Sequence, residues 1–272
     1  MDKKDIKSLT FSERRKEMEK LKPEKLLVRL GENKETVMNV LHEEYGIVEK
    51  DFELADFSFV PVSKVRELGL DKDLITGYGH DDSCCAYSAL QGILNSRDSS
   101  TTQIAIFASY EETGSAQTTG CQSEFVDDIF LELLGDARLA RQGIRNSNVI
   151  SADVCAGYES NYASHFEDGA SAIVGKGVGI VPFLGKKRGN DTEFQFRNYI
   201  KELALEYEIP YQVETTKVSE AGGGTVSTFF ATRGCHVIDI GTPVLAMHSP
   251  QEVISKKDLK ATYDLYKAFL EN

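Results

Sequence analysis

The sequence contains no run of 18 or more consecutive apolar residues, which excludes a transmembrane helix of ordinary length. Its opening segment, MDKKDIKSLTFSERRKEMEK, is too polar for a secretory signal. Positive charge is also scarce, because 31 Lys and Arg stand against 43 Asp and Glu and give a formal net charge of −12. This balance argues against a nucleic acid or an anionic membrane surface as the main partner, and it indicates no particular substrate.

Cysteine is sparse as well. The chain has five cysteines, and none of them shows the CxxC spacing of a structural metal site or a redox motif. Scattered reduced thiols in a cytoplasmic protein are therefore the best interpretation. Each thiol is expected to be a small buried hydrophobic group rather than a nucleophile. The five are Cys84, Cys85, Cys121, Cys155 and Cys235.

A chain of 272 residues fits one large domain or two small ones. Its 41% hydrophobic and 27% charged residues are ordinary for a globular protein that buries a core without disulfides. Near the start, residues 11–27 are dense in charge and indicate a helix or a solvated arm. The spacing of Val37, Val40 and Leu41 predicts a further helix at 35–45.

Beyond this region, predicted strands and helices alternate. The continuous apolar run QIAIFASY at 103–110 is typical of a buried parallel strand. The other strands are predicted at 57–64, 148–154, 211–215 and 236–244, and the helices at 83–94, 123–134, 194–207, 227–232 and 257–270. This alternation favours an α/β sandwich around a mixed or parallel sheet.

Acidic residues and a histidine gather where these strands end or just after them. Asp81 precedes a helix, Glu111 and Glu112 end the apolar run, Asp153 ends a strand, and His248 follows VLAM. In open α/β sheets, ligand sites form at strand ends of this kind.

Each of these residues has an ordinary structural alternative. Asp81 fits a helix cap, the two glutamates fit a solvated strand end, Asp153 fits a turn, and His248 fits a surface side chain. Together, however, they supply what a dinuclear metallohydrolase needs. Carboxylate oxygens and an imidazole nitrogen suit zinc, manganese or cobalt, one carboxylate bridges the two ions, and another takes a proton from the attacking water.

At these residues the chain resembles a known family. The strings GYGHDDSCCAYSAL, YEETGSAQTTG, ISADVCAGYESNY and GTPVLAMHSPQEV follow one another in the order seen in the aspartyl aminopeptidase family, which belongs to the clan of dinuclear zinc exopeptidases. The resemblance covers residues 45–272 and implies a three-layer α/β/α sandwich around a mixed, mostly parallel sheet. It also implies that residues 45–272 are an incomplete metallopeptidase domain and that residues 1–44 are a remnant of an inserted region.

The resemblance implies a role for each site residue. Asp81 would bridge two divalent ions, zinc in the first place. Glu112 and His248 would complete the first metal site, and Asp153 would bind the second ion. Glu111 would be the general base in the removal of N-terminal residues from peptides.

The resemblance also implies a preference for acidic N-terminal residues, matched by basic side chains near the pocket. Lys187 and Arg188 would provide this match, although a solvated basic loop explains the same stretch. Gly223 and Thr225 would contact the substrate through the backbone, and a helix-entry turn capped by Thr225 explains them equally well.

The chain departs from the family pattern in one respect. The family's fifth ligand is a histidine far upstream of the bridging aspartate, whereas the only histidines before Asp81 are His42 and His80. We therefore expect an N-terminally truncated domain that assembles as a homo-oligomer or with a separate N-terminal partner. The alternatives are a catalytically inactive homologue that acts as an interaction subunit and, with less support, another hydrolase of the clan such as a deacylase.

Overall fold

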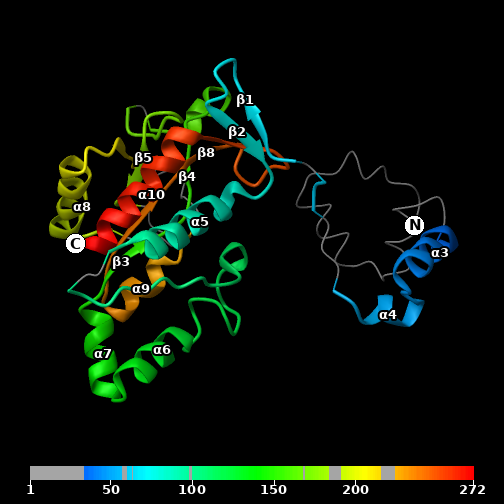
Figure 1. The fold of residues 1–272 in the computed structure, drawn as a ribbon, viewed down its shortest axis with the longest axis horizontal. Coiled ribbons are helices and arrows are strands. Elements are labelled where there is room, and N and C mark those ends of the chain that lie inside the picture. Colours follow the sequence, from blue (N-terminus) through cyan, green and yellow to red (C-terminus); the bar gives the residue numbers. More distant parts are fainter. Residues whose placement is uncertain are drawn as a thin grey trace. The chain divides into compact units, whose positions relative to one another are not determined.

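The computed structural model describes residues 34–56, 60–62, 64–97, 100–167, 169–183, 191–215 and 224–272 (Figure 1). The predicted helix or arm at 11–27 lies outside these residues. The chain divides into two compact units, residues 1–60 and 61–272. In the first unit, the apolar spacing predicted a helix at 35–45, and this prediction is confirmed. The described helices of this unit are α3 (Lys34–Tyr45) and α4 (Glu49–Leu54).

The second unit combines two mixed sheets with helices. Its strands are β1 (Arg66–Leu68), β2 (Leu74–Gly77), β3 (Asn148–Ser151), β4 (Cys155–Ala156), β5 (Val178–Val181), β6 (Tyr211–Val213), β7 (His236–Gly241), β8 (Pro243–Leu245) and β9 (Glu252–Ser255). Its helices are α5 (His80–Asn95), η2 (Glu111–Thr113), α6 (Phe125–Leu134), α7 (Ala137–Arg145), η3 (Ser160–His165), α8 (Phe194–Glu206), α9 (Ser227–Arg233) and α10 (Lys256–Glu271).

One sheet has the strand order β1-β2-β9-β8-β4 and the other has the order β3-β7-β5-β6. The chain passes from the four-stranded sheet to the five-stranded sheet at two places, between β3 and β4 and between β7 and β8. These two passages run side by side, because β3 pairs in parallel with β7 and β4 pairs in parallel with β8. At this crossing Gly241 lies against the backbone of Asp153, where a Cβ atom would overlap the aspartate carbonyl. The close approach of these two segments therefore fixes the position of the Asp153 backbone.

The largest hydrophobic cluster lies on one face of β7. Ile238 and Ile240 of β7 pack there with buried side chains of β5, α8 and α10. Val237 points the other way, because successive side chains of a strand alternate, and it packs in a second cluster with α6, α7 and α9. Helices thus contribute to the core on both faces of β7.

The cysteines are buried and unpaired in separate parts of this core. Cys84 and Cys85 lie in a cluster with β8 and β9, Cys121 and Cys235 lie in the cluster around Val237, and Cys155 packs against Ala172 and Val181. The prediction of buried free thiols is confirmed.

Three expectations about the sheets are wrong. Four of the seven described strand pairings are antiparallel, so the sheet arrangement is mixed without being mostly parallel. Residues 103–110 form no strand, because no described strand pairs with them, although Ile106 and Ala108 pack against the second cluster. Residues 60–62 and 64 are not in a strand either, and the rest of the predicted 57–64 strand lies outside the described residues.

The described helices include none that is long and apolar enough to cross a membrane.

Candidate active site

Asp81 stands at the start of α5, where the chain leaves β2. Gly79 precedes it in the left-handed conformation, with φ of 78°, and glycine adopts this conformation without steric cost. The backbone of Asp81 itself is not helical, with φ −80° and ψ 113°. The turn sends the carboxylate inward, and only 6% of the side chain is exposed. The predicted helix at 83–94 is confirmed. The observed helix begins earlier, so that Asp81 lies in its first turn.

Glu111 and Glu112 form a short 3-10 turn, η2, directly after the apolar run. Tyr110 before the turn and Ser115 after it are both left-handed, and the amide of Ser115 donates to the carbonyl of Tyr110 at 2.7 Å. The carbonyl of Gly114 accepts a hydrogen bond from the side chain of Gln122 at 2.5 Å. These bonds close a tight loop that directs the two neighbouring glutamates into one cavity.

His248 lies in the turn between β8 and β9. Its backbone is left-handed with φ of 63°, which is uncommon for a residue other than glycine. Its amide donates to Glu252 at 2.7 Å, and the amide of Ala246, another left-handed residue, donates to Glu159 at 2.7 Å. Two buried or half-buried glutamates thus hold the turn that presents the imidazole.

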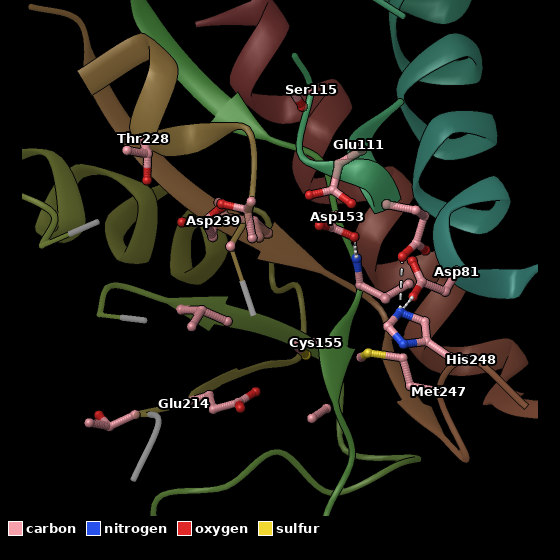
Figure 2. A pocket seen from close by; sticks show the side chains of 18 of the residues that line it. Asp81, Glu111, Ser115, Asp153, Cys155, Glu214, Thr228, Asp239, Met247 and His248 are labelled. Carbon is pink, nitrogen blue, oxygen red and sulfur yellow. Dashed lines mark hydrogen bonds and ion pairs between the residues drawn. The ribbon is translucent and has the colours of Figure 1, made fainter. Parts of the chain in front are cut away.

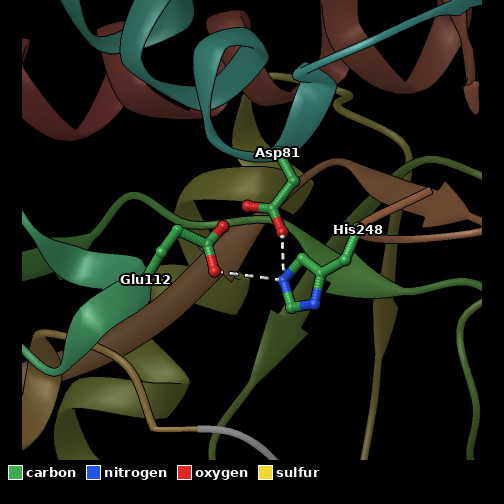
Figure 3. Close-up of side chains that lie close together, drawn as sticks. All are labelled: Asp81, Glu112 and His248. Atoms are coloured by element: carbon green, nitrogen blue, oxygen red, sulfur yellow. Dashed lines mark ion pairs between the residues drawn. The ribbon is translucent and has the colours of Figure 1, made fainter. Parts of the chain in front are cut away.

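These elements bring three side chains together (Figure 3). The Nε2 atom of His248 lies 2.9 Å from Oδ2 of Asp81 and 3.2 Å from Oε2 of Glu112. One ligand atom from each of the three residues lies within 4.8 Å of the other two. Residues from three distant parts of the sequence therefore converge on a single point.

A cavity of about 620 Å³ opens beside this cluster (Figure 2). Glu111 and Asp153 line it together with the three clustered residues. The carboxylate of Asp153 accepts a hydrogen bond from the amide of Val154 at 2.7 Å. All five site residues predicted as metal ligands or general base thus face one cavity.

Burial, followed by repulsion from neighbouring carboxylates, raises the pKa values of three carboxyl groups in the cavity. Burial and the Glu112 carboxylate raise the pKa of Asp81 to about 7, against a smaller opposing effect of His248. Burial, followed by the charges of Glu112 and Asp81, raises the pKa of Glu111 to about 7. Burial and Glu111 also raise the pKa of Asp153. A cation bound among these groups would relieve both the desolvation and the repulsion.

The donor set fits a divalent metal ion. Asp81 and Glu112 offer carboxylate oxygens and His248 offers an imidazole nitrogen, a combination that suits zinc. His80, next to Asp81, does not belong to this group. Its Nε2 atom lies beside Gly77 and has no hydrogen-bond partner among the described residues.

The predicted substrate-binding residues have different outcomes. Thr225 lines the cavity, where its hydroxyl donates to Oδ1 of Asp239 at 2.6 Å and also lies 2.6 Å from the hydroxyl of Ser227. Lys187, Arg188 and Gly223 lie outside the described residues, so their predicted roles stay predictions.

Three buried carboxyl groups of this region were not predicted. Asp239 and Glu214 line the cavity, and Glu252 accepts hydrogen bonds from the backbone beneath it. Asp239 had a signal in the sequence, because it is the one charged residue in the apolar run VIDIG and such a residue is expected to be buried. Glu214 and Glu252 sit in polar stretches that look like solvated surface.

Comparison with known proteins gives a consistent result. The sequence profile described as Aminopeptidase I zinc metalloprotease (M18) matches residues 2–270. A probable M18 family aminopeptidase 1 from Clostridium acetobutylicum is 34% identical over 248 residues, which cover 88% of this chain and 53% of the relative. A protein of the same name from Thermotoga maritima is 36% identical over 255 residues, which cover 89% of this chain and 56% of the relative. The chain spans about half the length of the curated relatives it matches.

Solved structures share the fold. The crystal structure of the M18 family aminopeptidase from Thermotoga maritima matches with a TM-score of 0.82 and 37% identity, covering 88% of this chain and 55% of that one. The structure of the S. cerevisiae mApe1 dodecamer matches with a TM-score of 0.64 and 20% identity, covering 77% of this chain and 48% of that one. At this lower identity, the second match shows the fold alone.

Proposed function

The chain belongs to the aminopeptidase I zinc metalloprotease (M18) family, and from this premise we propose that it acts in the metal-dependent removal of N-terminal residues from peptides. One observation carries the proposal above all. Asp81, Glu112 and His248 place three ligand atoms within 4.8 Å of one another at a cavity that Glu111 and Asp153 also line. A cavity of about 620 Å³ has room for the end of a peptide.

Two divalent ions, zinc in the first place and manganese or cobalt as alternatives, are part of the proposal. Asp81, Glu112 and His248 would hold one ion, and Asp81 and Asp153 would hold the other. When bound, the ions supply Lewis-acid polarisation of the scissile carbonyl and lower the pKa of water. Several carboxylates crowd around the cavity and repel one another. This crowding supports the proposal of two ions, because two ions offset more negative charge than one does.

Glu111 is the proposed general base. It lines the cavity next to a metal ligand without belonging to the cluster of three, so its carboxylate is available to accept a proton. It takes that proton from the attacking water and passes it to the amine that leaves.

A preference for acidic N-terminal residues is a narrower part of the proposal. The described cavity lining contains no lysine or arginine to pair with an acidic substrate side chain. The pairing cation would therefore come from Lys187 or Arg188, which lie outside the described residues. Thr225 would contribute to substrate binding from the cavity lining, beside Asp239.

Glu111→Gln and Glu112→Gln form a matched pair that tests the proposed roles. Both changes remove one charge from adjacent residues and keep the size of the side chain. Glu111→Gln should retain the zinc content of the unaltered chain and lower kcat by about 10²- to 10⁴-fold, the usual contribution of a general base. Glu112→Gln should lose zinc and turnover together, because it removes a ligand. Elemental analysis after dialysis and hydrolysis of aspartyl, leucyl and lysyl peptides measure the two effects.

Two results would contradict the proposal. Zinc binding that Glu112→Gln leaves unchanged would remove this residue from the metal site. An unaltered chain that binds no zinc and hydrolyses none of the peptides would exclude the proposed activity for this chain, leaving a non-catalytic role.

The proposal also includes the architecture of the domain, the oligomeric state and the cellular compartment. The two sheets would form the middle of a three-layer α/β/α sandwich, supported by the hydrophobic clusters on both faces of β7. The protein would assemble as a homo-oligomer, as the mApe1 dodecamer does. Its compartment would be the cytoplasm, supported by five unpaired cysteines.

A further inference from the structure

Glu252 connects the backbones of two residues of the candidate metal site. Its Oε2 atom accepts a hydrogen bond from the amide of Asp81 at 3.0 Å, and its Oε1 atom accepts one from the amide of His248 at 2.7 Å. The residue is only 2% exposed. One buried carboxylate thus joins the start of α5 to the turn between β8 and β9. In the sequence, Glu252 lies 171 residues from Asp81 and four residues from His248.

Both amides need such a partner. The first amides of a helix have no carbonyl of their own helix to donate to, and Asp81 lies in the first turn of α5. The amide of His248 belongs to a left-handed turn residue rather than to a strand ladder. A buried carboxylate satisfies both groups, and its negative charge also suits the start of a helix.

Glu252 is well placed for this role because its own backbone is fixed. It begins β9, which lies between β2 and β8 in the five-stranded sheet. Its neighbour across the pairing with β2 is Gly77, three residues before the helix begins. The carboxylate therefore accepts hydrogen bonds from the backbones of both metal-site residues while its own backbone is held rigidly in the sheet.

The need for this support is greatest at His248. Its side chain is 62% exposed, so little packing holds the imidazole in place. The ring is held by the contacts of its Nε2 atom with Asp81 and Glu112 and by the backbone of the turn, through the left-handed conformation and the hydrogen bond to Glu252. Asp81, by contrast, is 6% exposed in its side chain and is also held by packing.

We propose that Glu252 is a positioning residue of the metal site, which fixes the distance between Asp81 and His248 by accepting one backbone hydrogen bond from each. This inference rests on the proposed function, because it assumes that the two side chains bind a metal ion. Groups that orient metal ligands from behind affect metal affinity although they never touch the ion.

The chemistry of the side chain makes the inference testable. A glutamate offers an acceptor oxygen to each amide, whereas a glutamine of the same shape offers one oxygen and one NH₂ group. In Glu252→Gln, one of the two amides therefore faces a donor and loses its bond. The change is nearly isosteric, so it removes one acceptor and one negative charge without changing the shape of the side chain.

Glu159 provides a matched control, because its side chain contacts the same turn. Among the described residues, its carboxylate accepts one hydrogen bond, from the amide of Ala246 at 2.7 Å. The remaining oxygen of a glutamine satisfies that single amide, so Glu159→Gln should leave the turn intact. The two variants thus carry the same chemical change and differ in whether one or two amides depend on the carboxylate.

The experiment is a competition titration of zinc against a chelator for the unaltered chain and both variants, with circular dichroism to confirm folding. Glu252→Gln should raise the zinc dissociation constant by about 10- to 100-fold, the usual effect of losing a group that orients a ligand. Glu159→Gln should leave it unchanged. If Glu252→Gln does not fold, Glu252→Asp replaces it, because aspartate keeps the charge but is too short to reach both amides.

The outcomes separate this inference from the proposed function. Zinc affinity that is unchanged in a folded Glu252→Gln or Glu252→Asp chain overturns the positioning role and leaves the proposed function standing. An equal loss of affinity in Glu159→Gln also overturns it, because the effect would then reflect general loosening of the turn. Failure of the unaltered chain to bind zinc overturns both proposals together.

Discussion

At the scale of single residues, Glu214 is a buried carboxyl group whose ionisation should lower the stability of the fold. Its carboxyl group follows β6, is only 7% exposed and lines the cavity away from the three clustered residues. Its Oε2 atom has no hydrogen-bond partner in the part of the chain that the structure describes. Burial raises its pKa to about 7, against a smaller opposing effect of the Cys155 thiol. An ionised carboxylate is therefore poorly accommodated at this position.

This burial predicts how stability depends on pH. Below about pH 4.5, the carboxyl group of Glu214 is protonated in both the folded and the unfolded chain and adds no dependence. Between about pH 4.5 and 7 the unfolded chain releases the proton while the folded chain keeps it, so the free energy of unfolding falls as pH rises. The shift in pKa corresponds to a loss on the order of 3 kcal/mol, which stays constant above this window.

Glu214→Gln should remove this loss, because an amide does not ionise. Urea denaturation at pH 4.5, 6 and 8 measures the difference between the variant and the unaltered chain, which should grow with pH in favour of the variant. Parallel pH profiles for the two chains would contradict the raised pKa of Glu214.

At the scale of elements, the passage of the chain from one sheet to the other determines the position of Asp153 in the cavity lining. The chain has to pass from β3 to β4 alongside Gly241, and a methyl group at that glycine would overlap the carbonyl oxygen of Asp153. Glycine at this point is therefore a condition for the aspartate to face the cavity.

Gly241→Ala should destabilise the chain by roughly 1–3 kcal/mol, the usual cost of overpacking, and should lower its zinc content by displacing Asp153. Gly92→Ala in α5 is the control. There the nearest heavy atom to an added Cβ is 3.5 Å away, an ordinary contact, so stability and zinc content should be retained or improved. Urea denaturation and elemental analysis measure both effects. Equal zinc content in the two variants would mean that Asp153 does not depend on this glycine.

The longer helices and the strands β3, β6 and β7 could be predicted from the sequence, and most of the shorter elements could not. The helices at 194–206 and 256–271 agree with their apolar spacing. The run at 103–110 was misjudged because apolar character indicates burial, whereas a strand also needs a partner for its backbone. Strands as short as Val178–Val181 and Glu252–Ser255 carry too few residues to show a period.

The site was more predictable than the sheets. Asp81, Glu111, Glu112, Asp153 and His248 each end or follow an element and lie in a recognisable block of sequence. The resemblance of those blocks to the family implied that the five side chains share one site. Glu252 escaped prediction because its role depends on two backbone amides, and the direction of an amide is visible only in the folded chain.

At the scale of the whole molecule, the proposed homo-oligomer has a candidate contact surface on α6 and α7. Four leucines of this pair of helices are between 40% and 60% exposed, namely Leu131, Leu133, Leu134 and Leu139. A group of exposed apolar side chains of this kind favours association. Covering them by another copy of the chain would remove this apolar area from water.

Light scattering after gel filtration should therefore give a mass that is a multiple of 30.2 kDa. Leu133→Lys should reduce this mass, because it places a charge in the contact surface. Leu205→Lys changes a leucine of α8 that is 66% exposed and should leave the mass unchanged. A mass of a single chain for the unaltered protein would contradict the proposed oligomer.

The five buried cysteines give the folded molecule a set of internal reporters. Burial raises the pKa of the thiols of Cys121, Cys155 and Cys235, so these groups stay protonated and react slowly with alkylating reagents. The thiols of Cys84 and Cys85 are shielded in another part of the core. Because separate clusters carry separate thiols, the order in which an alkylating reagent reaches them records the order in which parts of the domain open, without any introduced label.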